Sequence, residues 1–330
     1  MMFITLLLLW SIVPAAFAQD AKLIEAAKKE GRLVLYGTMQ TDIFELLQKS
    51  FQKKTGIAID YWRSSATRVT ERTLSEARAG KALFDLVMST EDTTRIMLKE
   101  GILAKYDSPM SKDFPKDAID PELGARARNH IIGIVYNKEI IKPADAPKTL
   151  EDLVKPQYRG KLVMADPTQH TTTAQWLVNV HKLIGKEKSD KFVRELAAMK
   201  PTLVESFNPA AERITSGEFP IGITYVYYVY LNGIKGAPID YVRTGKFLGD
   251  ASYLTMFRKA PHPNAAKAFI DFFLDQESMS VMAKAGEFVN RKGIYPPVPD
   301  ADKIQFVEMD DLGEKVYAEK RKEFHKLFLQ

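Results

Sequence analysis

The order of its local elements constrains this chain more than any other feature. An apolar, β-branched run is followed by a short polar turn and then by an amphipathic helix, and this order occurs three times before residue 101. The expected strands are residues 32–36, 57–62 and 84–88. Strands that alternate with helices are typical of βαβ units. The sequence therefore predicts an α/β fold with mainly parallel sheets flanked by helices.

The later part of the chain continues the pattern. We expect further strands at residues 130–136, 161–165 and 220–224, and helices at residues 172–183 and 209–216. Asn208 before Pro209 is typical of a helix start, with Asn at the cap and Pro in the first turn. Pro263 and Asn264 are expected to begin another helix, and its apolar residues Ala266, Phe269, Ile270 and Phe273 would pack on one face.

The N-terminus has the pattern of a cleaved export signal. Residues 5–13 are apolar, and Ala16-Phe17-Ala18 is a small-x-small site. We expect residues 1–18 to be a signal peptide and the mature chain to begin at Gln19. The apolar run is shorter than the ~20 residues of a membrane-spanning helix. The chain contains no cysteine, which excludes disulfides, a lipid-anchored cysteine and thiolate metal sites. The expected location is the periplasm.

The charge distribution argues against a nucleic-acid-binding protein, and the absence of catalytic motifs argues against an enzyme. The net charge of +5 is spread over 47 basic and 42 acidic residues, so no nucleic-acid partner is expected. The sequence has no HExxH, GxSxG, Walker phosphate-loop or GxGxxG signature. We therefore expect a binding protein, and an enzyme on the same fold is the less favoured alternative.

Chain length predicts two lobes. Without residues 1–18, 312 of the 330 residues remain, and single cores usually divide above about 250–300 residues. No flexible Gly/Ser linker is present, so short extended crossings near residues 129–135 and 239–249 are expected to form a hinge. Lobe 1 would contain residues 19–128 plus about 250–285, and lobe 2 residues 129–249 plus about 286–330. We expect a monomer with a ligand cleft between its lobes.

The polar turns place the expected site. Ligands of α/β sheets bind beyond the carboxyl ends of the strands, where helix N-termini present free N–H groups. The turns that follow the three early strands supply candidate ligand-binding residues from lobe 1: Met39, Gln40, Arg63, Ser64, Ser65 and Thr90.

Several motifs carry a resemblance to one family. They are Tyr36 with its following turn, GKALFDLVMS at residues 80–89, GIVYN at 133–137, LEDLVKPQYRG at 150–160, SGEFPIGI at 216–223 and HPNAAKAFIDFF at 262–273. Together they resemble the periplasmic solute-binding proteins that include the ferric-ion-binding proteins. The resemblance implies a two-lobed type 2 periplasmic-binding fold. It also implies a role in an ABC importer, with a permease of the inner membrane as partner.

A run of tyrosines is similar to the tandem-tyrosine motif of the ferric-binding members. Tyr227 and Tyr228 match that pair, and phenolate oxygen suits Fe(III) because both are hard. Neighbours on a regular strand point to opposite faces, so the backbone must turn at Tyr227 for both to reach one metal. A continuing strand would instead place Tyr225 and Tyr227 on one face as an aromatic wall or as core packing.

Two metal-ligating side chains implied by the resemblance are absent from this chain or displaced in its sequence. The resemblance implies a histidine in the first turn, where Met39 or Gln40 stands. It also implies a carboxylate after the third strand, near Thr90, and the adjacent Glu91 is the candidate metal ligand there. The alternative role of Glu91 is a charge that stabilises a helix N-terminus.

Other residues favour an anion. His170, Thr171, Thr172 and Thr173 lead into a helix, and the resemblance implies that this turn binds a synergistic anion. Alternatively, one threonine is simply the helix cap. Arg63 could clamp a carboxylate or phosphonate, or it could be an ordinary exposed arginine. A guanidinium beside a trivalent cation is electrostatically poor.

The sequence leaves two ligands open. One is ferric iron, with or without a synergistic anion, as a transported ligand rather than a resident cofactor. The other is an organic anion such as a phosphonate, sugar phosphate or carboxylate. Convergence of the tyrosines on Glu91 would favour the metal, and convergence on Arg63 would favour the anion.

Overall fold

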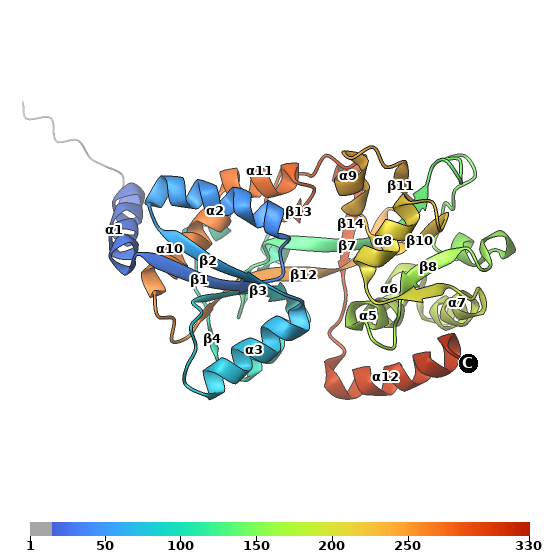
Figure 1. Ribbon diagram of the computed structural model, residues 1–330, viewed down its shortest axis with the longest axis horizontal. Coiled ribbons are helices and arrows are strands. Elements are labelled where there is room, and N and C mark those ends of the chain that lie inside the picture. The colour runs from blue at the N-terminus through green and yellow to red at the C-terminus, as the bar shows by residue number, and fades with distance from the viewer. Residues whose placement is uncertain (1–14) are drawn as a thin grey trace, which may run out of the picture.

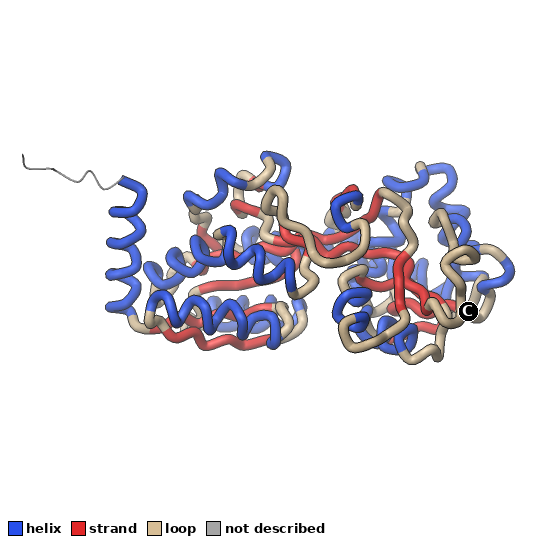
Figure 2. The backbone as a smooth tube through the Cα atoms, turned by 90° about the horizontal axis from the view of Figure 1, so that it is seen from above, coloured by secondary structure: helices blue, strands red, loops and turns tan. Residues whose placement is uncertain are grey.

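The chain forms two α/β bodies that lie side by side, joined by long strands (Figures 1 and 2). The computed structural model describes residues 15–330. The body that contains the N-terminal sheet is called lobe 1, and the other body is called lobe 2. The α/β prediction is confirmed, because strands and helices alternate through both bodies.

Lobe 1 contains the three βαβ units expected from the sequence. Its helices are α1 (Ala15–Glu30), α2 (Thr41–Thr55), α3 (Ala66–Arg78), α4 (Glu91–Lys99), α10 (Pro263–Phe273) and α11 (Gln276–Lys284). Its strands are β1 (Arg32–Gly37), β2 (Ala58–Arg63), β3 (Leu86–Thr90), β4 (Leu103–Ala104), β5 (Ile119–Asp120), β6 (Gly124–Ala125) and β13 (Phe288–Val289). Strand β1 pairs in parallel with both β2 and β3.

Lobe 2 contains the second group of elements. Its helices are α5 (Thr171–Asn179), α6 (His181–Ile184), α7 (Lys186–Ala198), α8 (Phe207–Thr215), α9 (Tyr228–Gly233) and α12 (Gly313–Phe328). Its strands are β8 (Leu162–Ala165), β9 (Thr202–Val204), β10 (Ile221–Tyr225), β11 (Ile239–Tyr241) and β14 (Gln305–Glu308). Strand β8 lies parallel to both β9 and β10. Single 3₁₀ turns occur at Pro109–Asp113, Lys116–Ala118, Glu151–Val154, Pro156–Tyr158 and Ala301–Lys303.

Two long antiparallel strands, β7 (Arg128–Asn137) and β12 (Lys246–Phe257), run between the lobes and change partners on the way. In β7, residues 128–131 pair with β12 and residues 132–136 pair with β10. In β12, residues 246–249 pair with β14 and residues 252–256 pair with β3. The strands approach closely at Gly249, where a Cβ atom would lie 2.3 Å from the carbonyl oxygen of His130. Only glycine fits at this position.

Each lobe has its own apolar core, as expected of units that pack independently. In lobe 1, Phe44 and Phe51 of α2 pack against Phe269 of α10. The predicted helix at Pro263 is confirmed, and its Ala266, Phe269, Ile270 and Phe273 are buried. Lobe 2 has a separate core that includes Trp176, Phe192 and Phe207.

Two helix predictions were wrong in detail. The helix expected at residues 172–183 begins one residue earlier and is divided at Val180 into α5 and α6. Helix α8 begins at Phe207 with Ser206 at its cap, so Asn208 and Pro209 lie inside its first turn. The Asn208 side chain donates instead to Glu212 Oε1, at 2.7 Å.

The predicted signal peptide lies mostly outside the described residues. Helix α1 begins at Ala15 and runs past the expected cleavage point after Ala18. Cleavage there therefore stays a prediction. Within residues 15–330, no helix is both long and apolar enough to cross a membrane.

Candidate ligand-binding cleft

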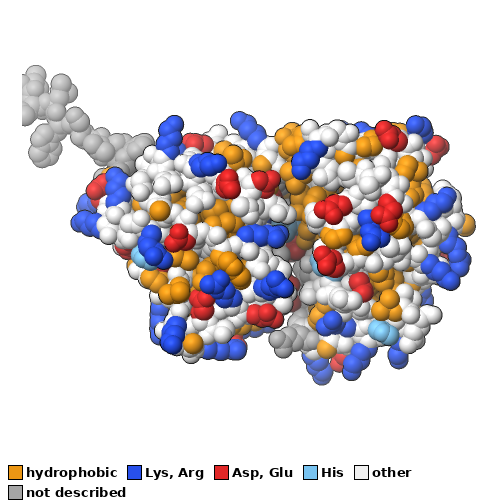
Figure 3. Space-filling model, viewed as in Figure 1, with side chains coloured by type: hydrophobic (Ala, Val, Ile, Leu, Met, Phe, Trp, Pro, Cys, Tyr) orange, Lys and Arg blue, Asp and Glu red, His pale blue; other side chains and the backbone are white. Residues whose placement is uncertain are grey.

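The lobes enclose a cleft of about 780 Å³, lined by residues from both lobes and from β7. The space-filling view shows a groove between the two halves of the molecule (Figure 3). The cleft lies at the carboxyl ends of β2, β3 and β10, because Arg63, Thr90 and Tyr225 end those strands and line it. This is the position expected for a ligand site in an open α/β sheet.

Four helices of nine or more residues begin at the wall of the cleft, and the short helix α9 begins there too, at Tyr228. The first turns of α3 and α4 contribute Thr67 and Thr93, and those of α5 and α8 contribute Thr171 and Phe207. Ser65 caps α3 by accepting a hydrogen bond from the backbone N–H of Arg68, at 3.4 Å. Helix N-termini carry partial positive charge and free N–H groups. Both lobes therefore direct a field that favours anions into the cleft.

Two arginines add full positive charge on the lobe 1 side. Arg63 ends β2 and Arg68 lies in the first turn of α3, and both are exposed and line the cleft. Neither guanidinium forms an ion pair with any side chain that the structure describes. Arg128 also lines the cleft, but it is buried and bonded to Glu287. The two free cations of the lobe 1 wall are therefore Arg63 and Arg68.

His170 supplies a neutral donor from lobe 2. Its Nδ1 accepts a hydrogen bond from the backbone N–H of Thr173 at 3.3 Å, which places the ring proton on Nε2. No described residue bonds to Nε2. Burial lowers the pKa of His170 to about 4, although Asp250 acts in the opposite direction. The ring is therefore neutral at ordinary pH, and in this tautomer its Nε2–H is a hydrogen-bond donor.

The tyrosines lie on a turn, as metal binding by both would require. Strand β10 ends at Tyr225, and Tyr227 has helical backbone angles (φ −61°, ψ −23°). The alternative of a continuing strand is therefore wrong. The rings of Tyr227 and Tyr228 are 4.3 Å apart, and that of Tyr225 lies 5.5 Å from Tyr227. All three line the cleft.

The tyrosine hydroxyls are held in the neutral form. Burial raises the pKa of Tyr228 to about 12, and the charge of Arg63 opposes this rise. Burial also raises the pKa of Tyr225 and Tyr227 well above the usual value. A metal would therefore have to displace tightly held protons from the pair.

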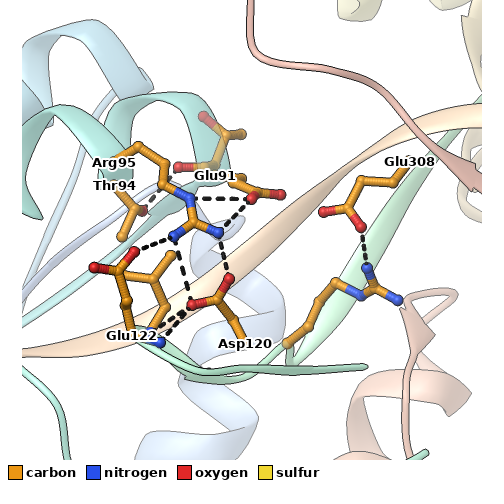
Figure 4. A network of polar contacts seen from close by, with 9 residues as sticks. Glu91, Thr94, Arg95, Asp120, Glu122 and Glu308 are labelled. Atoms are coloured by element: carbon orange, nitrogen blue, oxygen red, sulfur yellow. Dashed lines mark hydrogen bonds and ion pairs between the residues drawn. The ribbon is translucent and has the colours of Figure 1, made fainter. Parts of the chain in front are cut away.

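Glu91 does not face the cleft, so its assignment as a metal ligand was wrong. Its carboxylate accepts from Arg95 Nη2 at 2.9 Å, in a network where Arg95 also bonds Asp120 and Glu122 (Figure 4). We call these four residues the Arg95 network. Burial, together with the nearby Glu308, raises the pKa of Glu91 to about 8. The next residue, Asp92, lines the cleft instead.

Two further site predictions were wrong. The side chain of Met39 is fully buried in the lobe 1 core, because the first turn directs it inward. Thr173 is also fully buried, and its hydroxyl lies 2.8 Å from His170 Nδ1, so it orients the histidine instead of meeting a ligand. The remaining predicted ligand-binding residues line the cleft: Gln40, Arg63, Ser64, Ser65, Thr90, His170, Thr171, Thr172 and Tyr225.

Sequence reasoning missed one wall of the cleft. The turn of residues 205–208 lies there and follows β9, which has only three residues. The rule that sites follow strand ends would have found this turn if so short a strand had been recognised. His130 was also missed. It lines the cleft, and its Nδ1 lies 2.8 Å from Asp250 Oδ1 on the neighbouring strand.

Acidic and imidazole groups do not form a metal cluster. Within residues 15–330, no three His, Asp or Glu side chains are placed to hold a metal ion. The cleft is rich in hydrogen-bond donors, namely guanidinium, imidazole N–H, hydroxyls and helix N-termini, and it also contains the carboxylates of Asp92, Glu205 and Glu287.

Comparisons with known proteins agree with this geometry. Residues 81–315 match a family model described as bacterial extracellular solute-binding protein. A relative from Serratia marcescens named Fe(3+)-binding periplasmic protein is 22% identical over 86% of this chain and 87% of its own. The fold is similar to that of the periplasmic binding protein AfuA from Actinobacillus pleuropneumoniae, solved with fructose-6-phosphate (TM-score 0.73, 22% identity, 90% of this chain and 97% of that one). It is also similar to iron-bound HitA from Pseudomonas aeruginosa (TM-score 0.74, 20% identity, 89% and 99%).

Proposed function

The chain belongs to the bacterial extracellular solute-binding proteins, and from this premise we propose that it captures a small organic anion between its lobes. The membership also confirms the resemblance inferred from the motifs, and the similar structures confirm the two-lobed type 2 periplasmic-binding fold. The family consists of binding proteins of ABC importers and not of enzymes.

The observation that carries this proposal is the set of donors that converge on one cleft. Asp92, Glu205 and Glu287 also line it, and of these Glu287 is already paired with Arg128. Arg63 and Arg68 have no ion-pair partner among the described side chains, and His170 offers its Nε2–H. Four helix N-termini open on the same space. A phosphate, phosphonate or carboxylate group accepts hydrogen bonds from all of these groups, and guanidinium can bind it through two parallel N–H bonds.

The position of the tyrosines favours the anion over iron. Tyr228 lies within electrostatic range of Arg63, whereas Glu91 is bonded to Arg95 and lines a different cavity. A trivalent cation beside Arg63 would be repelled. The hydroxyl groups of the tyrosines are suited to donate hydrogen bonds to an oxyanion, since burial keeps them protonated.

Ferric iron is the second candidate ligand. Two adjacent phenol rings 4.3 Å apart on one turn support it, because phenolate is a good donor to Fe(III). The Serratia relative is named for that ion. In this alternative, Tyr227 and Tyr228 would bind the cargo, and Arg63 and His170 would hold a synergistic anion beside it.

Capture would proceed by closure of the lobes about a hinge. We place the hinge where β7 and β12 exchange partners, near residues 131 and 249. A ligand that contacts both walls stabilises the closed state, because it gains contacts there that the open state lacks. The closed monomer would work in the periplasm, after removal of residues 1–18, and deliver its ligand to an inner-membrane permease.

Calorimetry against a panel of small anions tests the proposal. We expect binding of at least one organic phosphate, phosphonate or carboxylate and no heat from Fe(III) in anion-free buffer. A Fe(III) titration that produces a visible phenolate charge-transfer band, lost in Tyr228→Phe, would instead establish the second candidate.

A further inference from the structure

A second cavity adjoins the cleft. It has a volume of about 670 Å³ and lies between α3 and α4 of lobe 1 and α5 and the start of α12 of lobe 2. Thr67, Asp92, Thr93 and Thr171 line both spaces, so the two meet along a shared wall. We call this second cavity the side chamber. The side chamber is therefore the space next to the cleft that a longer ligand would enter.

The side chamber differs chemically from the cleft. Leu74, Ile96 and Leu312 give it an aliphatic surface, and its carboxylates include those of Glu71 and Asp311. Of its charged lining residues, only Lys99 is basic. The unpaired arginines of the cleft have no counterpart here, where apolar and acidic groups predominate and Asp92 is shared with the cleft. A second anionic group would be repelled here, whereas a hydrocarbon chain would be removed from water.

Ile96 is the most informative residue of the side chamber. It is a half-buried aliphatic side chain on α4 and belongs to none of the apolar cores. The buried residues of that helix are Thr93, Thr94 and Met97. Ile96 therefore presents apolar surface to the side chamber that no core cluster covers.

We infer that the ligand has two chemically different ends: an anionic head bound in the cleft and an uncharged apolar tail that occupies the side chamber. This inference rests on the proposed function, because it takes the binding of an anion in the cleft as its starting point. It adds the substrate class, which is an amphiphile with one anionic group at one end, and not a compact anion or a molecule with acidic groups at both ends.

Three phosphates that differ only in the tail test this inference by calorimetry on the full chain: ethyl phosphate, hexyl phosphate and hexane-1,6-bisphosphate. Hexyl phosphate adds four methylenes, and their burial is expected to tighten binding by roughly tenfold or more. The bisphosphate should lose that gain, since its second phosphate would meet the carboxylates of the side chamber. Equal affinity for ethyl and hexyl phosphate, or tightest binding of the bisphosphate, would overturn the inference and leave anion capture intact. Binding of none of the three would overturn the inference, and the panel of small anions then decides separately whether the cleft captures an anion.

A matched pair of variants tests whether the apolar tail of the ligand lies in the side chamber. Ile96→Asp places a charge in the side chamber and should reduce the preference for hexyl over ethyl phosphate to about twofold or less. Ile140→Asp makes the same substitution at an exposed position of lobe 2 and should keep the full preference. Comparable melting temperatures for both variants show that both are folded. If Ile96→Asp keeps the full preference for hexyl phosphate, the tail does not lie in the side chamber. If that variant fails to fold, the calorimetry of the three phosphates on the wild-type protein decides the inference.

Discussion

The cleft and the Arg95 network both lie where the lobes meet, and they use arginine in opposite ways. Arg63 and Arg68 in the cleft have no acidic partner among the described side chains. Arg95, in contrast, is surrounded by Glu91, Asp120 and Glu122 (Figure 4). Unpaired charge is typical of a site that awaits a ligand, and paired charge is typical of a structural contact. The difference separates a binding surface from a structural one within a single interface.

The geometry of β12 keeps the two regions apart. Asp250 lies beside Tyr225 and His130 on the side of the cleft, whereas Tyr253 lines the cavity of the Arg95 network. Residues an odd number apart on a strand point to opposite faces. The same strand thus contacts two residues of the cleft wall with one face and lines the cavity of the Arg95 network with the other.

The largest effect is expected from Arg63→Gln. Removal of this charge should weaken the binding of the anionic ligand by about 2–3 kcal/mol, on the order of 100-fold in Kd. The unfolding free energy should be unchanged, because Arg63 is exposed and unpaired. Calorimetry measures the affinity, and urea denaturation measures the unfolding free energy. A loss of stability with intact binding would mean that Arg63 has a structural role and not a ligand-binding one.

Arg95→Gln should have the opposite effects: it should lower the stability of the protein and leave ligand affinity nearly unchanged. It leaves Glu91, Asp120 and Glu122 without their shared cation, and we expect a loss of about 2 kcal/mol in unfolding free energy. Ligand affinity should change by less than about twofold, because the network lines a different cavity. Arg63→Gln is the matched control. A large loss of affinity in Arg95→Gln would show that the network takes part in binding.

Glu91 makes the stability of the Arg95 network depend on pH. Its pKa is raised from 4.5 to about 8, so between these values the folded state holds more protons than the unfolded state. The contribution of Glu91 to stability is fully present below pH 4.5 and is lost as the pH rises through about 8. Allowing for solvent screening, we expect a loss of about 1 kcal/mol between about pH 5 and pH 8. Urea titrations of wild type and Glu91→Gln measure it, and the same slope in both would disprove the assignment.

The smallest effect concerns His170 in the cleft. Because its pKa is lowered to about 4, the ring stays neutral and donates through Nε2 across the ordinary pH range. Anion affinity should therefore vary by less than about twofold between about pH 5.5 and pH 7.5, if a ligand with no titration in that range is used. Markedly tighter binding at the lower pH would mean that the histidine gains a proton in the complex.

The sequence predicted the fold well because the period of its apolar residues is a local property. Strands β1 and β3 and helices α2 and α10 follow from that pattern alone. The start of helix α8 did not, since both Ser206 and Asn208 are acceptable cap residues and the helix begins after Ser206.

The site was predicted to the level of turns but not of side chains. Successive residues at the start of a helix point about 100° apart, so the sequence could place a carboxylate near Thr90 but could not choose between Glu91 and Asp92. In the structure Asp92 lines the cleft, and Glu91 lines the cavity of the Arg95 network. Met39 failed for a similar reason, because its turn directs the apolar side chain into the core.

Native mass spectrometry of the protein purified from a bacterial periplasm tests the central claim most directly, because it weighs whatever the cleft retains. We predict a mass increment of one organic anion that is absent in Arg63→Gln. An increment of one iron atom, retained in Arg63→Gln and lost in Tyr228→Phe, would contradict the account.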